Sequence, residues 1–229
     1  MARELPMFPL PIVLFPGTPQ PLHIFEPRYR QLVADCLAGD RRFGVAYVAP
    51  RDEHAGEPAP NAGDVGCVAV IRTAHELPDG RSNILTEGER RFVLLDWCAS
   101  ERLYRRARVE EFDDDPIDPA EAGTLAADVR AEFERLTAAL NTLTSRDFEE
   151  PAALPADPTA LSFRVAGALE LEPEAKRALQ AGRSTTARLR QLAALLKPLA
   201  EDATRRAVVR ERAKRNGRGG AHSEIERAS

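Results

Sequence analysis

The spacing of the apolar residues changes once along this chain, at the acidic run Asp113-Asp114-Asp115. Before that run, apolar residues form short stretches in which apolar and polar side chains alternate, a pattern typical of β-strands. After it, apolar residues recur every three or four positions, as they do along one face of an α-helix. A chain that is strand-like first and helical afterwards indicates an α+β fold.

We expect six short strands in the first part of the chain, at residues 12–15, 43–49, 65–73, 84–87, 92–97 and 104–112. Pro78-Asp79-Gly80 is a turn signal, because glycine tolerates the positive φ that a tight reversal needs. It predicts that residues 65–76 pair with residues 81–87. Several short strands joined by Gly- and Pro-containing turns indicate a barrel-like sheet.

One helix interrupts these strands. We expect it to start at Pro27, because a proline in the first turn leaves no donor unsatisfied, and to end at Gly39, a residue type common just after helices. Its apolar residues follow the helical spacing, and its position suggests a helix that covers an open end of the barrel. These residues are Tyr29, Leu32, Val33, Cys36 and Leu37.

Four further helices are predicted after residue 118, because Asp118, Asp157, Glu172 and Ser184 each precede a helical pattern. We expect them to pack as a small antiparallel bundle and Pro198 to kink or end the last one. The division of the chain is therefore a β domain over residues 1–112, a helical subdomain over 118–204 and a basic tail over 205–229. The tail is expected to be disordered beyond Asn216.

Charge and cysteine content restrict the compartment and the partners. The chain has 36 acidic and 32 basic residues, so no overall positive field attracts nucleic acid or an anionic membrane. No apolar run is long enough for a membrane span, and prolines interrupt the apolar start of the chain. The 3 cysteines lie far apart within apolar stretches, which is typical of free thiols in a reducing compartment. We expect a cytoplasmic protein.

The motifs of several enzyme classes are missing from the sequence. There is no Gly-Lys pair for a phosphate-binding loop, no Gly-x-Ser-x-Gly, and no Cys/His spacing suited to zinc. We therefore predict no metal, no cofactor and no catalytic activity. The basic residues Arg102, Arg105, Arg106 and Arg108 alternate in direction along a strand, which favours solvated charges over a nucleic-acid stripe.

The most unusual segment is the N-terminal one, which holds 7 of the 18 prolines between residues 6 and 27. Because proline removes ladder donors, we expect this segment to run at a sheet edge. Its apolar side chains are then either packed inward or available to a guest. Two motifs of this segment are Phe15-Pro16-Gly17 and the run from His23 to Tyr29, and a third motif further along the chain is Glu87-Gly88-Glu89-Arg90-Arg91-Phe92. Together with the rest of the segment, these motifs resemble the substrate-binding domain at the amino end of Lon proteases.

The resemblance spans about four fifths of the chain. It implies a PUA-like pseudo-barrel of six strands with one early helix, followed by a helical bundle. It also implies a receptor for unfolded or tagged polypeptides, which in Lon feeds an ATPase ring and a Ser-Lys peptidase. Because neither a Walker motif nor a Ser-Lys dyad is present, we expect a stand-alone member of the family.

We therefore predict a non-catalytic module that binds unfolded or extended polypeptides and that has a separate protease or AAA+ machine as a second partner. Arg28 and Arg90 are expected to form structural ion pairs with Glu26 or Glu87. Two alternatives stay open, an RNA-binding PUA-like protein and an enzyme that binds a small molecule in the barrel mouth. The predicted peptide groove consists of Leu22, His23, Phe25 and Tyr29, with Glu87 and Arg91 at its rim.

Overall fold

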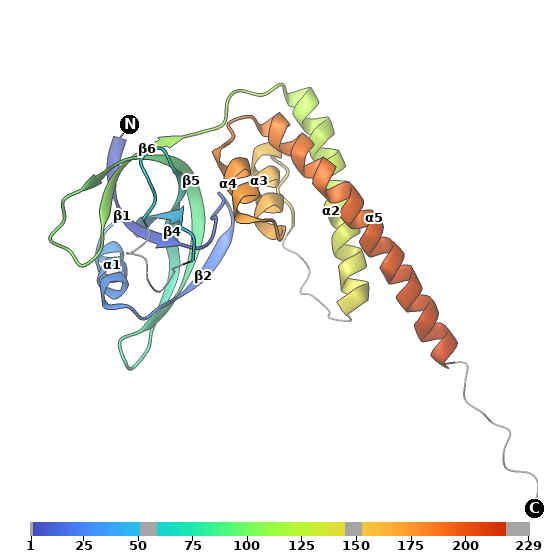
Figure 1. The fold of residues 1–229 in the computed structure, drawn as a ribbon, viewed down its shortest axis with the longest axis horizontal. Helices are drawn as coiled ribbons and strands as arrows, with labels where there is room; N and C mark the ends of the chain where they lie inside the picture. Colours follow the sequence, from blue (N-terminus) through green and yellow to red (C-terminus); the bar gives the residue numbers. More distant parts are fainter. Residues whose placement is uncertain (1, 51–58, 145–152, 219–229) are drawn as a thin grey trace, which may run out of the picture.

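The computed structural model describes residues 2–50, 59–144 and 153–218. The chain forms a β-barrel with one helix and, after a short connection, a group of four helices (Figure 1). Two short helices of this group lie against the barrel, and a pair of long helices extends away from it. The α+β architecture expected from the change in apolar spacing is confirmed.

Six strands build the barrel, and β5 is the strand that closes it. β5 pairs with β2 along its first half and with β6 along its second half, so that β5-β4-β3-β1-β6 form a closed ring. The β1–β3 pair is parallel and the other pairs are antiparallel. The strands are β1 (Ala2–Leu10), β2 (Pro19–Ile24), β3 (Arg42–Tyr47), β4 (Val65–Glu76), β5 (Ser82–Cys98) and β6 (Arg106–Phe112).

The predicted strands are correct in the middle of the barrel and wrong at its start. Residues 12–15 belong to a connection, and the first strand lies earlier, at Ala2–Leu10, where Leu5 and Met7 are buried. The expected strands 84–87 and 92–97 are one strand of 17 residues. The hairpin between residues 65–76 and 81–87 is confirmed, with Gly80 at φ 77° in its turn. The edge position expected for the proline-rich segment is confirmed for β2 and wrong for β1, which holds Pro6 and Pro9 and pairs with both β3 and β6.

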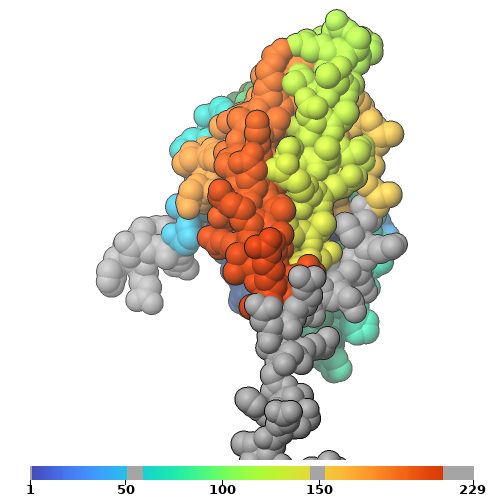
Figure 2. Space-filling view, turned by 90° about the vertical axis from the view of Figure 1, so that its right-hand side faces the viewer, coloured from blue at the N-terminus to red at the C-terminus, as the bar shows by residue number. Residues whose placement is uncertain are grey.

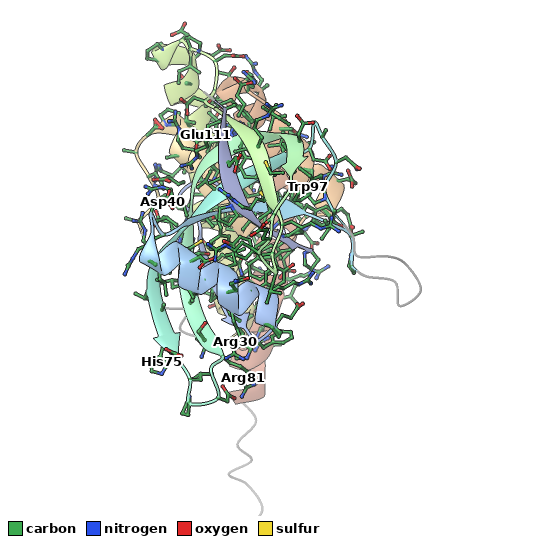
Figure 3. All side chains as sticks on the ribbon, turned by 90° about the vertical axis from the view of Figure 1, so that its left-hand side faces the viewer. Arg30, Asp40, His75, Arg81, Trp97 and Glu111 are labelled. Atoms are coloured by element: carbon green, nitrogen blue, oxygen red, sulfur yellow. The ribbon has the colours of Figure 1, made fainter. Side chains whose placement is uncertain are left out.

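Helix α1 (Pro27–Ala38) begins at the predicted proline, and the N–H of Gly39 donates to the carbonyl oxygen of Cys36 at 3.0 Å at its end. Its buried residues Leu32 and Val33 join the apolar core of the barrel. Figure 3 shows α1 lying across the barrel, with Arg30 close to the β4–β5 turn that carries Arg81. The prediction of a helix covering the barrel is confirmed.

The four later helices start at the predicted capping positions. They are α2 (Pro119–Thr144), α3 (Pro158–Ala168), α4 (Pro173–Ala181) and α5 (Thr185–Arg218). The carboxylate of Asp157, for example, accepts from the N–H of Ala160 at 3.0 Å and caps α3. Four short motifs were therefore enough to locate the helix starts.

Helix α5 is much longer than the sequence suggests. It continues through Pro198, which lies on the exposed side, and it crosses the predicted boundary at residue 205. Its apolar stripe is carried on by Ala200, Ala203 and Ala207, which are all buried. Because alanine is small, these residues contribute little to the apolar pattern that predicts a helix face, although they pack against α2 in the structure. The disorder predicted beyond Asn216 is wrong for residues 217–218, which are helical, and otherwise lies outside the described residues.

Helices α2 and α5 lie side by side and run in the same direction, as Figures 1 and 2 show. Glu121 near the start of α2 is paired with Arg190 near the start of α5, and Arg135 reaches the carbonyl oxygen of Lys197 further along. The predicted antiparallel arrangement is therefore wrong for this pair. The two short helices α3 and α4 return the chain to the starting end of α2, so α5 sets out from the same end.

The turn Phe15-Pro16-Gly17-Thr18 joins the barrel to the helices. Phe15 belongs to the helical core, where its ring centroid lies 6.3 Å from that of Phe163. Gly17 adopts φ 68°, and its N–H donates to the carbonyl oxygen of Gly88 at 2.8 Å. A Cβ on Gly88 would lie 2.1 Å from the carbonyl oxygen of Phe15. The two backbones are therefore so close that only glycine fits at position 88.

Candidate polypeptide-binding clefts

Two adjoining clefts flank the proline-rich connection between β1 and β2. The first, here called the barrel cleft, has a volume of about 310 Å³ and lies between the end of β1, the start of α1 and residues 48–50. The second, the interdomain cleft, has a volume of about 250 Å³ and lies between residues 11–20 and the α3–α4 region. They meet at Pro11, which lines both. Together they form an open surface along the connection.

The sequence explains why this connection makes a firm floor. Successive side chains of residues 13–15 alternate between two cores, because Val13 and Phe15 pack into the helical core and Leu14 into the barrel core. Gln180 of α4 donates from its Nε2 to the carbonyl oxygen of Leu14 at 2.6 Å. Anchoring to both sides fixes the backbone, while Pro11 stays exposed between them.

An aromatic stack forms one wall of the barrel cleft. The rings of Phe8 and Tyr29 are stacked with centroids 3.9 Å apart. The guanidinium of Arg28 lies 4.4 Å from the centre of the Tyr29 ring and is paired with Glu26 at 2.8 Å. Burial raises the pKa of the Tyr29 phenol, so this hydroxyl is protonated at neutral pH and is a hydrogen-bond donor. The wall therefore offers apolar surface with a polar edge.

The other predicted groove residues lie elsewhere. Phe25 is 59% exposed and stacks on His23 with ring centroids 6.0 Å apart. The Nδ1 of His23 lies 2.7 Å from the Oδ1 of Asn83 on β5. Glu87 is paired with Arg72 at 2.9 Å, and Leu22 packs partly against the barrel core. The structure thus brings Tyr29 into a cleft, whereas none of the other predicted groove residues lines the barrel cleft or the interdomain cleft.

The placement of Arg91 at an accessible rim is wrong, because its side chain is only 2% exposed. It is paired with the buried carboxylate of Asp114, which Arg188 and the hydroxyl of Thr185 also contact. The Arg91 guanidinium also donates to the carbonyl oxygens of Gln180 and Gly182, at 2.8 and 2.7 Å. The sequence pattern marked this arginine as notable but could not show that its partner is Asp114.

This network, here called the arginine clamp (Arg91, Asp114 and Arg188), connects the barrel to the helices. Both guanidiniums lie near the ring of Phe163, that of Arg91 at 4.9 Å and that of Arg188 at 3.9 Å from the ring centroid. Burial lowers the pKa of both arginines, and the negative charge of Asp114 opposes that shift. Removal of one charge would leave an uncompensated buried charge, so the network couples the barrel to the helical part.

The predicted ion pairs have mixed outcomes. Arg28 pairs with Glu26 as expected, whereas Arg90 pairs with Asp113 and, at 3.7 Å, with Glu111. Arg90 on β5 lies close to the end of β6, because these two strands pair. Its partners are therefore the acidic residues at the end of β6, and neither Glu26 nor Glu87.

Most of the basic cluster on β6 and the preceding loop is neutralised. Arg102 pairs with Asp35 at 3.3 Å, Arg106 with Glu4 at 3.1 Å and Arg108 with Asp96 at 2.5 Å. Arg105 lies over the ring of Trp97. Paired guanidiniums have weaker attraction for phosphates, which agrees with the expectation of ordinary surface charges.

Two of the three thiols, those of Cys36 and Cys67, are buried and poorly reactive. Burial raises the pKa of Cys36 and of Cys67 to about 12, so both are almost fully protonated at neutral pH. Within residues 2–50, 59–144 and 153–218, no group of three or more His, Cys, Asp or Glu side chains could hold a metal ion. Over the same described ranges, no helix is both long and apolar enough to span a bilayer.

Sequence reasoning found one side of the clefts and missed the other. The concentration of prolines and large apolar residues was visible between residues 6 and 27. Leu171, Pro173 and Lys176, which face this segment across the interdomain cleft, carry no motif and come from a separate part of the chain. Only the folded structure shows that they line the same cavity.

Comparisons with known proteins support a single family. The family model described as the ATP-dependent protease La (LON) substrate-binding domain matches residues 4–198. Lon protease 1 of Thermus thermophilus is 30% identical over 197 residues, which is 84% of this chain and 24% of that protein. Lon protease 2 of Herpetosiphon aurantiacus is 27% identical over 84% of this chain and 23% of its own length. The chain thus spans about a quarter of the length of these relatives.

Solved structures show the same fold. A crystal structure of a Lon N-terminal domain protein from Xanthomonas campestris matches with a TM-score of 0.58 and 27% identity, and covers 84% of this chain and 98% of its own. The N-terminal domain of a Mycobacterium avium complex Lon protease matches with a TM-score of 0.62 at 19% identity, over 87% of this chain and 99% of its own. The second likeness concerns the fold alone.

Proposed function

Because this chain belongs to the family of Lon substrate-binding domains, we propose that it is a non-catalytic module that holds unfolded or extended polypeptides in the clefts on either side of Pro11. The observation that carries the proposal is the firm apolar floor of residues 8–14 between two walls. An extended chain presents apolar side chains at regular intervals, which suits two adjoining shallow clefts better than one deep pocket.

Side-chain capture is favoured over addition of a strand to the sheet. β2 is the free edge strand, and its positions 19 and 21 are prolines, which have no N–H to donate. A guest strand paired with β2 would therefore lose ladder hydrogen bonds. The exposed Phe25, just after β2, offers an additional apolar contact. Leu22, His23 and Glu87 lie on β2 and β5 outside the two clefts, and there they would contact a peptide together with Phe25. We call this region the outer surface.

The proposed partners follow from this role. Clients are unfolded or extended polypeptides in the cytoplasm, and a separate protease or AAA+ machine is the second partner that would use them. Binding of a disordered segment has to offset the cost of ordering that segment, so we expect weak affinity for a single copy of the chain. Several copies held together would bind more tightly through avidity.

A titration with a fluorescently labelled, permanently unfolded client protein tests the proposal. Ile12→Asp replaces an apolar side chain of the interdomain cleft by a charged one and should weaken binding about tenfold or more, because the apolar contact with the client is lost and binding would dehydrate a carboxylate. Leu103→Asp is the matched control, since Leu103 is 65% exposed in the β5–β6 connection and lines neither cleft. Phe25→Asp tests the outer surface separately.

Saturable binding that Ile12→Asp weakens and Leu103→Asp leaves unchanged would support the cleft as the binding site. Absence of saturable binding at roughly tens of micromolar, where weak single-site clients should bind, would refute the proposal. An effect of Phe25→Asp alone would move the site to the outer surface of β2.

A further inference from the structure

The interdomain cleft contains one ammonium group without a counter-charge. Lys176 of α4 lines the cleft together with Ile12, Leu14 and Leu171. Its Nζ donates to the carbonyl oxygen of Gly167 at 3.4 Å, which is long for a hydrogen bond. An ammonium has three N–H groups, so two of them have no protein acceptor in the described part of the chain.

The acidic residues near this lysine form no ion pair with it in the described part of the chain. Among the described residues, no carboxylate pairs with Lys176, although the charge of Glu170 acts on it through space. Glu174, two residues before it, is paired with Arg177 at 3.0 Å. Burial lowers the pKa of Lys176, because the apolar surroundings disfavour its charged form. The cation is therefore desolvated without an ion pair to compensate.

Two other cations of the described chain have a different setting. Lys197 on α5 is exposed, and the barrel-cleft cation Arg28 has Glu26 as its partner. A cleft in which apolar side chains and a half-buried ammonium lie together, with no carboxylate of the described residues paired to that ammonium, is suited to a ligand with apolar side chains and one negative group. A carboxylate would accept hydrogen bonds from the two free N–H groups and so replace the hydrogen bonds to water that the lysine loses on burial.

We infer that the interdomain cleft is a carboxylate subsite, in which Lys176 binds a carboxylate of the polypeptide while the partly exposed side chains of Ile12 and Leu171 contact its apolar side chains. This inference rests on the proposed function and narrows its substrate class to apolar segments with an acidic group. Two sources supply that chemistry, the α-carboxylate at the end of a chain and the side chain of an internal Asp or Glu.

Three labelled peptides of the same apolar sequence distinguish these sources. The first ends in a free carboxylate, the second in an amide, and the third in an amide with one internal Glu. Fluorescence anisotropy measures their affinities for the full chain. We expect at least one acidic peptide to bind about tenfold more tightly than the plain amide, the magnitude of one charge-assisted hydrogen bond. Whichever acidic peptide gains affinity identifies the source.

Lys176→Gln removes the charge and keeps a donor for Gly167, so it should reduce this preference to about one. Lys176→Arg should retain it, and Lys197→Gln is the control that should leave it unchanged. An unaltered affinity for the plain amide shows that each variant is folded and that its clefts are intact.

Equal affinity of the wild type for all three peptides would overturn the inference, as would a preference that survives in Lys176→Gln. In both cases the amide peptide still binds, so the proposed function stands. Failure of all three peptides to bind would overturn the inference and the proposed function together.

Discussion

Replacing Asp114 by asparagine should destabilise the chain far more than the same change at its neighbour Asp113. The side chain of Asp114 is 6% exposed and compensates two guanidiniums that are 2% exposed each. Asparagine keeps the shape of the side chain but leaves both buried cations without a counter-charge. Breaking a buried ion pair by removing one partner costs about 3–5 kcal/mol. We expect a loss of this size in the free energy of unfolding.

Asp113→Asn is the matched control. The side chain of Asp113 is 70% exposed and pairs only with the half-exposed Arg90, so its contribution should be between about 0 and 1 kcal/mol. The two substitutions are adjacent, chemically identical and change net charge by the same amount. Any difference between them therefore reports on burial and on the arginine clamp.

Urea unfolding followed by far-UV circular dichroism measures both variants. In thermal unfolding of the same variants, a loss of about 3–5 kcal/mol corresponds, for a chain of this size, to a decrease in Tm of roughly 6–20 °C. If Asp114→Asn unfolds within about 1 kcal/mol of Asp113→Asn, the clamp contributes little and the reasoning from burial is wrong.

Three further substitutions or reactions test the packing. Gly88→Ala should destabilise the chain by about 3 kcal/mol in the same urea assay, because the new Cβ would clash with the carbonyl oxygen of Phe15. Gly123→Ala on α2 is the control and should stabilise the chain slightly, because no atom lies within 4 Å of the new Cβ. Pro198→Ala should raise the free energy of unfolding by about 1–3 kcal/mol, since α5 continues through this position, and a loss of stability would contradict the continuous helix. In the native chain at pH 8, a maleimide should modify Cys98 much faster than Cys36 and Cys67. The pKa of about 12 of these two buried thiols leaves little thiolate until the pH rises toward that value. Equal modification rates, measured by mass spectrometry, would contradict their burial.

The local features of this fold were readable from the sequence because short-range chemistry determines them. Asp157, Glu172 and Ser184 precede α3, α4 and α5, and each gives a helix-start signal within a few residues. Gly80 likewise marked the β4–β5 turn. The long-range features were not readable. Nothing near Arg91 in the sequence indicates that Asp114 and Arg188 surround it, and so the sequence predicts an exposed groove rim where the structure has a buried clamp.

The same distinction applies to the candidate site. The proline-rich floor was recognisable because it is continuous in the sequence, whereas the walls come from α1 and from the α3–α4 region. β1 was missed because its strand carries prolines at positions 6 and 9, which weakened the β signal. The parallel course of α2 and α5 depends on two short helices that return the chain, a topological fact that amphipathic spacing does not encode.

The central claim is that extended polypeptides bind on either side of Pro11, and the most direct test is a methyl NMR titration of the full chain with an apolar, unfolded peptide. We predict that the largest shifts occur at the methyl groups of Leu10, Ile12, Val13 and Leu171, which line the two clefts. Largest shifts at Leu85 on the outer side of β5, or at Leu140 and Leu199 on the long helices, would contradict the claim.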